Sequence, residues 1–355
     1  FWLKLLKSSK KRHRRSLTGH KTLQAMGGNK RMGGTKNSVM LGLFVVSAVW
    51  GGYVSWELHK EVRSRQLRQA EGYPSYSDFS WSAWVCLGLV LAQKVFKVIF
   101  RDVASAMLVR QSRWHQQVWG AKVERCCDAV FKGSYYVVVT VWAYVILRDK
   151  PWVPSVLGGS GETRFCWTDG FPFQPLSDDI TTLYLTVVGY HLSEVLLHIF
   201  EPHLPDFWDM LLHHTVACFL VSFSYVLNYV RIGSLVLVLH GATDIFIYAS
   251  KVLVDTSCVR LKAASYLGLV GSYAYFRIYV FPMHVMRSAW IESVQQAKVE
   301  TAWGFLNFAL CVLLLLHMYW FGLIIKIGVT YRKTGVARDM VSNLSAMDVK
   351  ENKKQ

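Results

Sequence analysis

The sequence has few charged residues for its length. Asp, Glu, Lys and Arg make up only 18% of its 355 residues, whereas an average soluble domain has about 25%. Hydrophobic residues make up 52%, and the mean hydropathy is +0.24. A disordered chain needs low hydrophobicity and high net charge, so this composition excludes that class.

Cysteine is also scarce and scattered. The seven cysteines include no C-x-x-C pair, and only Cys126 and Cys127 are adjacent. Disulfide frameworks and structural zinc sites show regular or paired cysteine spacing. We therefore expect neither of them, and we expect no bound metal.

Acidic residues are in the minority, with 23 Asp and Glu against 40 Lys and Arg, for a net charge of +17. Such an excess can indicate nucleic-acid binding. Here, however, it is concentrated at the ends and in short segments between apolar runs, and residues 1–37 hold eleven Lys and Arg and no acidic residue. We expect no nucleic-acid partner and interpret residues 1–38 as a basic cytosolic tail that sets membrane topology.

What the sequence has in abundance is apolar segments of about the 20 residues that a membrane span requires. They predict an all-α polytopic transmembrane bundle of seven or eight spans. The second candidate contains Lys94 and Lys97, and the third is preceded by an amphipathic segment, 101–129. The candidates are 39–56, 80–100, 130–147, 180–200, 209–230, 232–254, 265–286 and 303–327.

The positive residues also predict the orientation of the spans. With eight spans and a cytosolic N-terminus, the cytosolic segments would hold 27 Lys and Arg, and the opposite loops, including 57–79, would hold ten. Lys and Arg are enriched in cytosolic loops. We therefore expect a multi-pass protein with both termini in the cytosol, residues 331–355 forming the cytosolic C-terminal tail.

Four ionisable residues lie in predicted spans, where such groups are expensive and usually functional. They are His213 and His214 in one span, and His240 and Asp244 in the next. His214 lies sixteen residues before Val230, in the turn between these spans, and Asp244 fourteen residues after it. Because a helix rises 1.5 Å per residue, both lie about 21–24 Å from the turn, at one depth near the cytosolic face. His240 and Asp244 share a helix face.

Other polar residues in the spans are open to two interpretations. Arg277 and His317 are each isolated in apolar sequence, which suits structural pairing or snorkelling as well as chemistry. His191, Glu194 and His198 lie on one side of a span, either at a polar cytosolic end or on a cavity wall. A di-iron enzyme would need several histidine boxes, and only His213 and His214 form a close pair.

This set of residues resembles the signature of the TLC-domain family, most nearly the longevity-assurance ceramide synthases. The resemblance covers roughly residues 125–330, after a segment 39–124 that holds the first two spans and the amphipathic connector. The residues that carry it are Asp206-Phe207-Trp208-Asp209-Met210, His213-His214, Ser224-Tyr225, Asn228, Arg231-Ile232-Gly233, His240, Asp244, Lys251 and Phe276-Arg277-Ile278.

The resemblance implies a six-helix core and a ceramide synthase of the endoplasmic reticulum membrane. Such an enzyme transfers an acyl group from acyl-CoA to the amine of a sphingoid base, with no cofactor. Its partners would be these substrates, membrane lipids and a second copy or paralogue in a dimer. The implied catalytic residues are His213, His214, Asp244 and His240. The implied substrate-binding residues are Asn228, Ser224, Arg277, Lys251 and Trp208.

The chemistry leaves two routes open. A histidine of ordinary pKa suits a general base that takes a proton from the substrate ammonium, with Asp244 orienting the imidazole. Alternatively, a histidine attacks the thioester first and forms an acyl-imidazole.

One position departs from the resemblance. The family usually has Asp directly after the histidine of the second helix, where this chain has Gly241. Gly241 motivates a second hypothesis, a non-catalytic lipid-binding or regulatory subunit that partners an active paralogue. A transporter is a third and weaker option, because two related halves with broken helices are not evident.

Overall fold

The computed structural model describes residues 51–68, 72–110, 116–200, 207–296 and 301–334. The chain forms two compact units, residues 1–56 and 57–355. In the first unit only residues 51–56 are described, and they are helical. The predicted basic tail, most of the span 39–56 and nearly all of the C-terminal tail therefore lie outside the described residues.

The described part of the second unit is built of helices and contains no strand. Five of its helices are long and apolar enough to cross a membrane, namely α3 with the preceding turn, α4, α5, α7 and α10. The prediction of an all-α polytopic membrane protein is confirmed. The long helices are α3 (Phe79–Met107), α4 (Gln116–Leu147), α5 (Asp178–Phe200), α6 (Phe207–Val226), α7 (Val230–Leu253), α8 (Val259–Ser272) and α10 (Thr301–Thr334).

Short elements complete the second unit. The 3₁₀ turns are η2 (Tyr76–Asp78), η3 (Ser155–Leu157) and η4 (Thr163–Cys166). After α8 the chain continues as two π-helical segments, η5 (Tyr273–Met286) and η6 (Ser288–Glu292), and then as α9 (Ser293–Gln296). Extended π-helical geometry is rare, and π turns are frequent at functional sites. Arg277 lies in η5.

The helix α4 is longer than the sequence predicted. We expected an amphipathic segment followed by a short span, but Gln116–Leu147 forms one helix. Its first half is held by packing and charge pairing. Cys126 and Cys127 are buried against the end of α3, and Lys122 pairs with Asp255 at 2.8 Å. In α3, Lys97 pairs with Asp128 on α4 at 2.7 Å.

Residues 57–68 are helical, whereas we expected 57–79 to be a loop. Arg65 explains the difference. Its guanidinium donates to the Glu61 carboxylate one helical turn away and to the carbonyl of Leu227, both at 2.6 Å. That carbonyl lies just past the end of α6, where helix carbonyls lack an intrahelical partner. Arg65 thus ties this helix to the α6–α7 turn.

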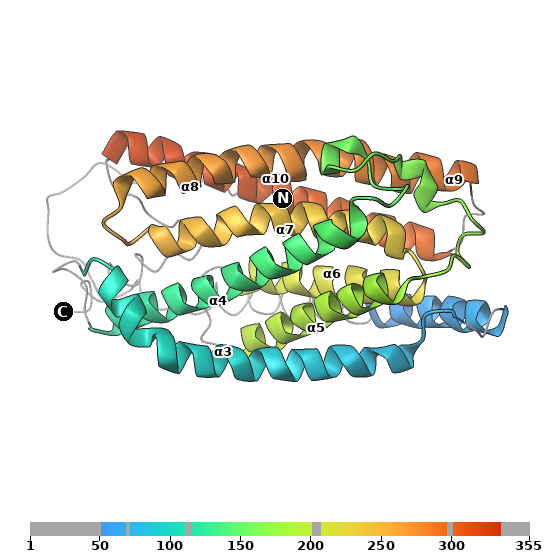
Figure 1. The fold of residues 1–355 in the computed structure, drawn as a ribbon, viewed down its shortest axis with the longest axis horizontal. Coiled ribbons are helices and arrows are strands. Elements are labelled where there is room, and N and C mark those ends of the chain that lie inside the picture. Colours follow the sequence, from blue (N-terminus) through green and yellow to red (C-terminus); the bar gives the residue numbers. More distant parts are fainter. Residues whose placement is uncertain (1–50, 69–71, 111–115, 201–206, 297–300, 335–355) are drawn as a thin grey trace, which may run out of the picture. The chain divides into compact units, whose positions relative to one another are not determined.

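Neighbouring helices of the second unit pack in pairs (Figure 1). The helix α4 packs along α7, and α3 packs along α5. The helix α10 packs against η5 and α6. Between α6 and α7 the turn is tight, because Asn228 adopts a left-handed backbone with φ of 56°, a conformation that Asn tolerates better than most residues. The turn that the sequence predicts between these two spans is present.

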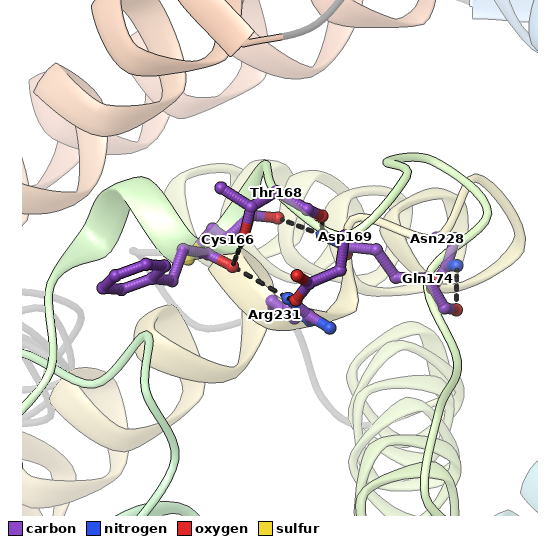
Figure 2. Close-up of polar contacts among 7 residues, drawn as sticks. Cys166, Thr168, Asp169, Gln174, Asn228 and Arg231 are labelled. Carbon is purple, nitrogen blue, oxygen red and sulfur yellow. Dashed lines mark hydrogen bonds and ion pairs between the residues drawn. The ribbon is translucent and has the colours of Figure 1, made fainter.

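The loop between α4 and α5 is fastened to this turn by buried polar groups (Figure 2). Arg231 donates to the Phe165 carbonyl at 2.9 Å and pairs with Asp169 at 2.8 Å. The Asn228 amide donates to the carbonyl of Gln174 at 3.0 Å. Unpaired buried polar groups are costly, so these bonds hold the loop in one conformation over the end of the helix pair.

Candidate functional site

A cavity of about 410 Å³ lies among α4, α5, α6, α7, α8 with η5, and α10. Five of the nine catalytic and substrate-binding residues predicted from the sequence line it. Those five are His213, His214, Asp244, Lys251 and Arg277.

The adjacent histidines both reach the cavity but face different neighbours. Their ring centroids are 5.4 Å apart. His213 meets the edge of Trp320 on α10 at 5.0 Å, while His214 lies 5.5 Å from the ring of His198 on α5. Adjacent helical residues diverge by about 100°, so the edge of α6 faces the cavity. The buried Nδ1 of His213 has no hydrogen-bond partner among the described residues.

Asp244 pairs with arginine and not with histidine. Its Oδ1 lies 2.5 Å from a guanidinium nitrogen of Arg277, and both side chains are largely buried. The same nitrogen donates to the carbonyl of His240 at 3.4 Å. Asp244 therefore holds η5 against α7, and its expected bond to an imidazole is not present among the described residues.

His240 forms a partly buried pair with His317 and does not line the cavity. The two Nε2 atoms are 3.0 Å apart, and the Nδ1 of His240 lies 2.8 Å from the Val236 carbonyl. Because a carbonyl only accepts, Nδ1 carries the hydrogen, and the Nε2 of a neutral His240 accepts from His317. His317 is fully buried. This pair joins α7 to α10, and neither histidine lines the cavity.

Three nominated substrate-binding residues lie away from the cavity. Ser224 lies 2.5 Å from the hydroxyl of Tyr184, and Asn228 fixes the α6–α7 turn. Ser224 follows His213 by eleven residues, or roughly 16 Å along the helix, which explains why it does not reach the histidines. Trp208 is 59% exposed. We assign none of the three to the substrate.

A second, largely buried ion pair reaches the cavity wall through Glu194, and the sequence pattern did not predict it. Lys132 on α4 lies 2.6 Å from Glu194 on α5, and the same carboxylate oxygen is 4.0 Å from the Nε2 of His214. The expected topology counts Lys132 among the cytosolic residues. A signal is nevertheless present, because Lys132 lies fifteen residues before the end of α4 and Glu194 sixteen after the start of α5. Equal depth follows from helical rise.

One end of the cavity is basic. Arg125, Lys251 and Lys262 line it where α7 connects to α8. The Nζ of Lys251 lies 5.2 Å from the ring centre of Tyr248, and Lys262 donates to the Thr256 carbonyl at 2.9 Å. Such cations suit a phosphate-bearing ligand.

Gly241 faces α4 and does not line the cavity. A Cβ atom at this position would lie 2.2 Å from the Oγ1 and 3.3 Å from the Cβ of Thr140. The first distance is far below van der Waals contact, so a side chain at this position would force the Thr140 hydroxyl to move. The family resemblance predicts Asp at position 241. The Cβ atom of that Asp would clash with the Thr140 side chain.

Comparison with known proteins gives consistent results. Among curated proteins, "Ceramide synthase hyl-1" of Caenorhabditis elegans is 25% identical over 235 residues, covering 63% of this chain and 62% of its own length. "Ceramide synthase 4" of Bos taurus is 28% identical over 226 residues, 63% of this chain and 56% of its own. "Ceramide synthase hyl-2" of Caenorhabditis elegans is 24% identical over 303 residues, 81% of this chain and 88% of its own.

The first two matches thus span about three fifths of those relatives' lengths. The profile of the TLC domain matches residues 125–326. This match covers more than half of the 355 residues and every helix that lines the cavity. The chain therefore belongs to the TLC-domain family.

Proposed function

We propose that this chain is a ceramide synthase, which transfers a fatty acyl group from acyl-CoA to the amine of a sphingoid base within the membrane. The observation that carries the proposal is the placement of His213 and His214 on one cavity, together with Asp244, Arg277 and Lys251. The names of the curated relatives support the choice of reaction.

The proposed reaction uses the histidines to move protons. Transfer of an acyl group from a thioester to an amine is downhill, so the proposal involves no metal or cofactor. The amine is an ammonium at neutral pH and must lose a proton before it attacks. A neutral imidazole suits this step, and the alternative route through an acyl-imidazole uses the same side chains.

The two ends of the cavity suit the two parts of acyl-CoA. Arg125, Lys251 and Lys262 form the basic end, where they would bind the phosphates of the donor. Apolar side chains such as Leu269 and Ile324 line the wall between α8 and α10, which would accommodate hydrocarbon. In this arrangement the thioester lies between the phosphates and the acyl chain.

Purified full-length protein in mixed micelles, given isotope-labelled acyl-CoA and sphinganine, is expected to form labelled ceramide detectable by mass spectrometry. His213→Ala and His214→Ala are each expected to lower the rate by roughly 10²–10⁴, the usual contribution of general acid–base catalysis. His284→Ala is the matched control, because His284 packs against Tyr279 and does not line the cavity.

Undiminished ceramide formation in both cavity variants would refute the assignment. If the native protein binds both substrates and forms no ceramide, the chain is a non-catalytic lipid-binding subunit instead. Acylation of a sphingoid base by an active paralogue only when this chain is present would also show that the chain is a non-catalytic subunit.

We also propose residence in the endoplasmic reticulum membrane with both termini in the cytosol, supported by the distribution of Lys and Arg. The loop between α4 and α5 then faces the lumen. Glu162 and Arg164 are exposed there and pair with each other at 2.7 Å. The double substitution Glu162→Asn and Arg164→Thr creates an acceptor sequence and is expected to add one endoglycosidase-sensitive glycan. The native segment Asn343-Leu344-Ser345 is also an acceptor sequence, and a glycan on Asn343 instead would show that the topology is the reverse of the proposed one.

A further inference from the structure

The ion pair between Lys132 and Glu194 has no part in the mechanism described so far. It lies on the cavity wall through Glu194, whose side chain is only 3% exposed, while that of Lys132 is 18% exposed. Burying two charges removes their hydration at a large cost in free energy. A buried ion pair therefore contributes little net stability to the fold. A buried carboxylate on the cavity wall, whose counter-ion Lys132 does not itself line the cavity, therefore suggests a ligand with a positive charge.

The surroundings of Glu194 suit an ammonium group. Three tyrosines from α4, α5 and α7 line the same wall, and the ring of Tyr136 stacks on that of Tyr248 with centroids 5.5 Å apart. Tyrosine faces attract cations. The Nε2 of His214 lies 4.0 Å from the Glu194 carboxylate, so a cation bound at Glu194 would lie beside a candidate base.

The second buried carboxylate is committed elsewhere. Asp244 accepts from Arg277 at 2.5 Å, and the same guanidinium nitrogen also donates to the His240 carbonyl. Arginine stays charged and makes several directed bonds, whereas lysine is a point charge on a flexible stem. A ligand that displaced Lys132 from Glu194 would break the one bond described between them. A ligand that displaced Arg277 from Asp244 would also disturb the bond from Arg277 to the His240 carbonyl.

We propose that Glu194 binds the ammonium group of the long-chain amine, and that the ammonium of Lys132 occupies this place when the amine is absent. This inference rests on the proposed function and identifies the subsite of one substrate. The bound ammonium gives one proton to the imidazole of His214, and the neutral nitrogen attacks the thioester carbonyl. The C–S bond breaks, the second proton goes to the leaving thiolate, and an amide, a thiol and one proton result.

The test compares two variants with opposite expected effects on binding. Purified full-length protein in detergent is titrated with sphinganine and with the matched lipid that has a hydroxyl in place of the amine. Glu194→Gln is expected to weaken amine binding by roughly tenfold or more, because it removes a charge-assisted hydrogen bond, and to leave the hydroxyl analogue unchanged. Lys132→Met removes the competing cation and is expected to bind the amine as tightly as the native protein or more tightly.

Asp128→Asn serves as the matched control, because it neutralises a carboxylate that pairs with Lys97 at 2.7 Å outside the cavity. The control is expected to retain the native preference for the amine. Equal weakening by Glu194→Gln and Lys132→Met, or equal weakening of amine and hydroxyl analogue, would overturn the inference and leave the pair a structural link. If Glu194→Gln fails to fold, the direction of the Lys132→Met effect decides.

Failure of the subsite and failure of the function are distinguishable. Suppose that the native protein prefers the amine, that Glu194→Gln abolishes this preference, and that the native protein forms no ceramide. This result would support the amine subsite and refute the proposed activity. Suppose instead that the native protein forms ceramide and that Glu194→Gln keeps the full preference for the amine. This result would support the proposed activity and refute the amine subsite.

Discussion

Arg277→Met is expected to lower the free energy of unfolding by about 3–5 kcal/mol, the cost of removing one partner from a buried ion pair. The side chains of Arg277 and Asp244 are 4% and 14% exposed, and their charged atoms are 2.5 Å apart. Methionine has similar length and no charge, so the substitution leaves the carboxylate buried without its cation. Unfolding by SDS titration in mixed micelles measures the loss.

A double-mutant cycle separates the charge from the packing. Asp244→Asn alone leaves the guanidinium buried without an anion and is expected to be similarly destabilising. The double variant has no uncompensated charge and is expected to recover most of the loss, because an ion pair replaced by neutral groups is often close to neutral. Losses that simply add in the double variant would show that the two residues do not act as a pair.

Lys60→Met is the matched control for the effect of burial. Lys60 pairs with Glu57 at 2.8 Å, a similar separation, but its side chain is 53% exposed. Exposed pairs contribute about 0–1 kcal/mol, so little change is expected. A loss at Lys60 as large as that at Arg277 would contradict the argument that burial makes the difference.

Gly241→Asp is expected to be the second strongly destabilising change, by about 3–5 kcal/mol. The new Cβ would lie 2.2 Å from the Oγ1 of Thr140, and the substitution would place a carboxylate at a buried position of α7 that faces α4. The variant is therefore expected to lose folded protein in detergent without any gain in acyl transfer. Increased ceramide formation by Gly241→Asp would contradict this and favour a regulatory native protein.

The effect of Gly241→Ala on the free energy of unfolding is expected to depend on the residue at position 140. Gly241→Ala adds only the clashing Cβ and is expected to cost roughly 1–3 kcal/mol, as overpacking does. In a Thr140→Ala background the same change is expected to be neutral or stabilising by up to about 1 kcal/mol, because alanine favours helix over glycine. Thr140→Ala itself is expected to cost little, since its Oγ1 is buried without a hydrogen-bond partner among the described residues.

The depth of a residue along its helix follows from the amino-acid sequence. The spacing from Val230 predicts one level for His214 and Asp244, and both line the same cavity. The same reasoning matches Lys132 with Glu194 once the ends of α4 and α5 are fixed. Helical rise is a local property of the backbone, so distance from a turn can be counted from residue numbers alone.

The amino-acid sequence also sufficed for the class of protein and the family. Apolar runs, clustered positive charge and the run of residues from Asp206 to Lys251 all belong to local segments of the chain. The helical ends were less predictable, because the start of α4 depends on contacts with α3 and with Asp255. Asp255 lies 133 residues further along the chain than its partner Lys122.

The rotation of each helix about its own axis, and hence the partner of each polar group, followed only from packing. Asp244 meets Arg277, His240 meets His317, and Gly241 meets Thr140. Each of these neighbours comes from a different helix, so no spacing within one segment indicates it. Which charges face the cavity depends on how six helical elements settle against one another. That is a balance of side-chain shape and buried charge over the whole second unit.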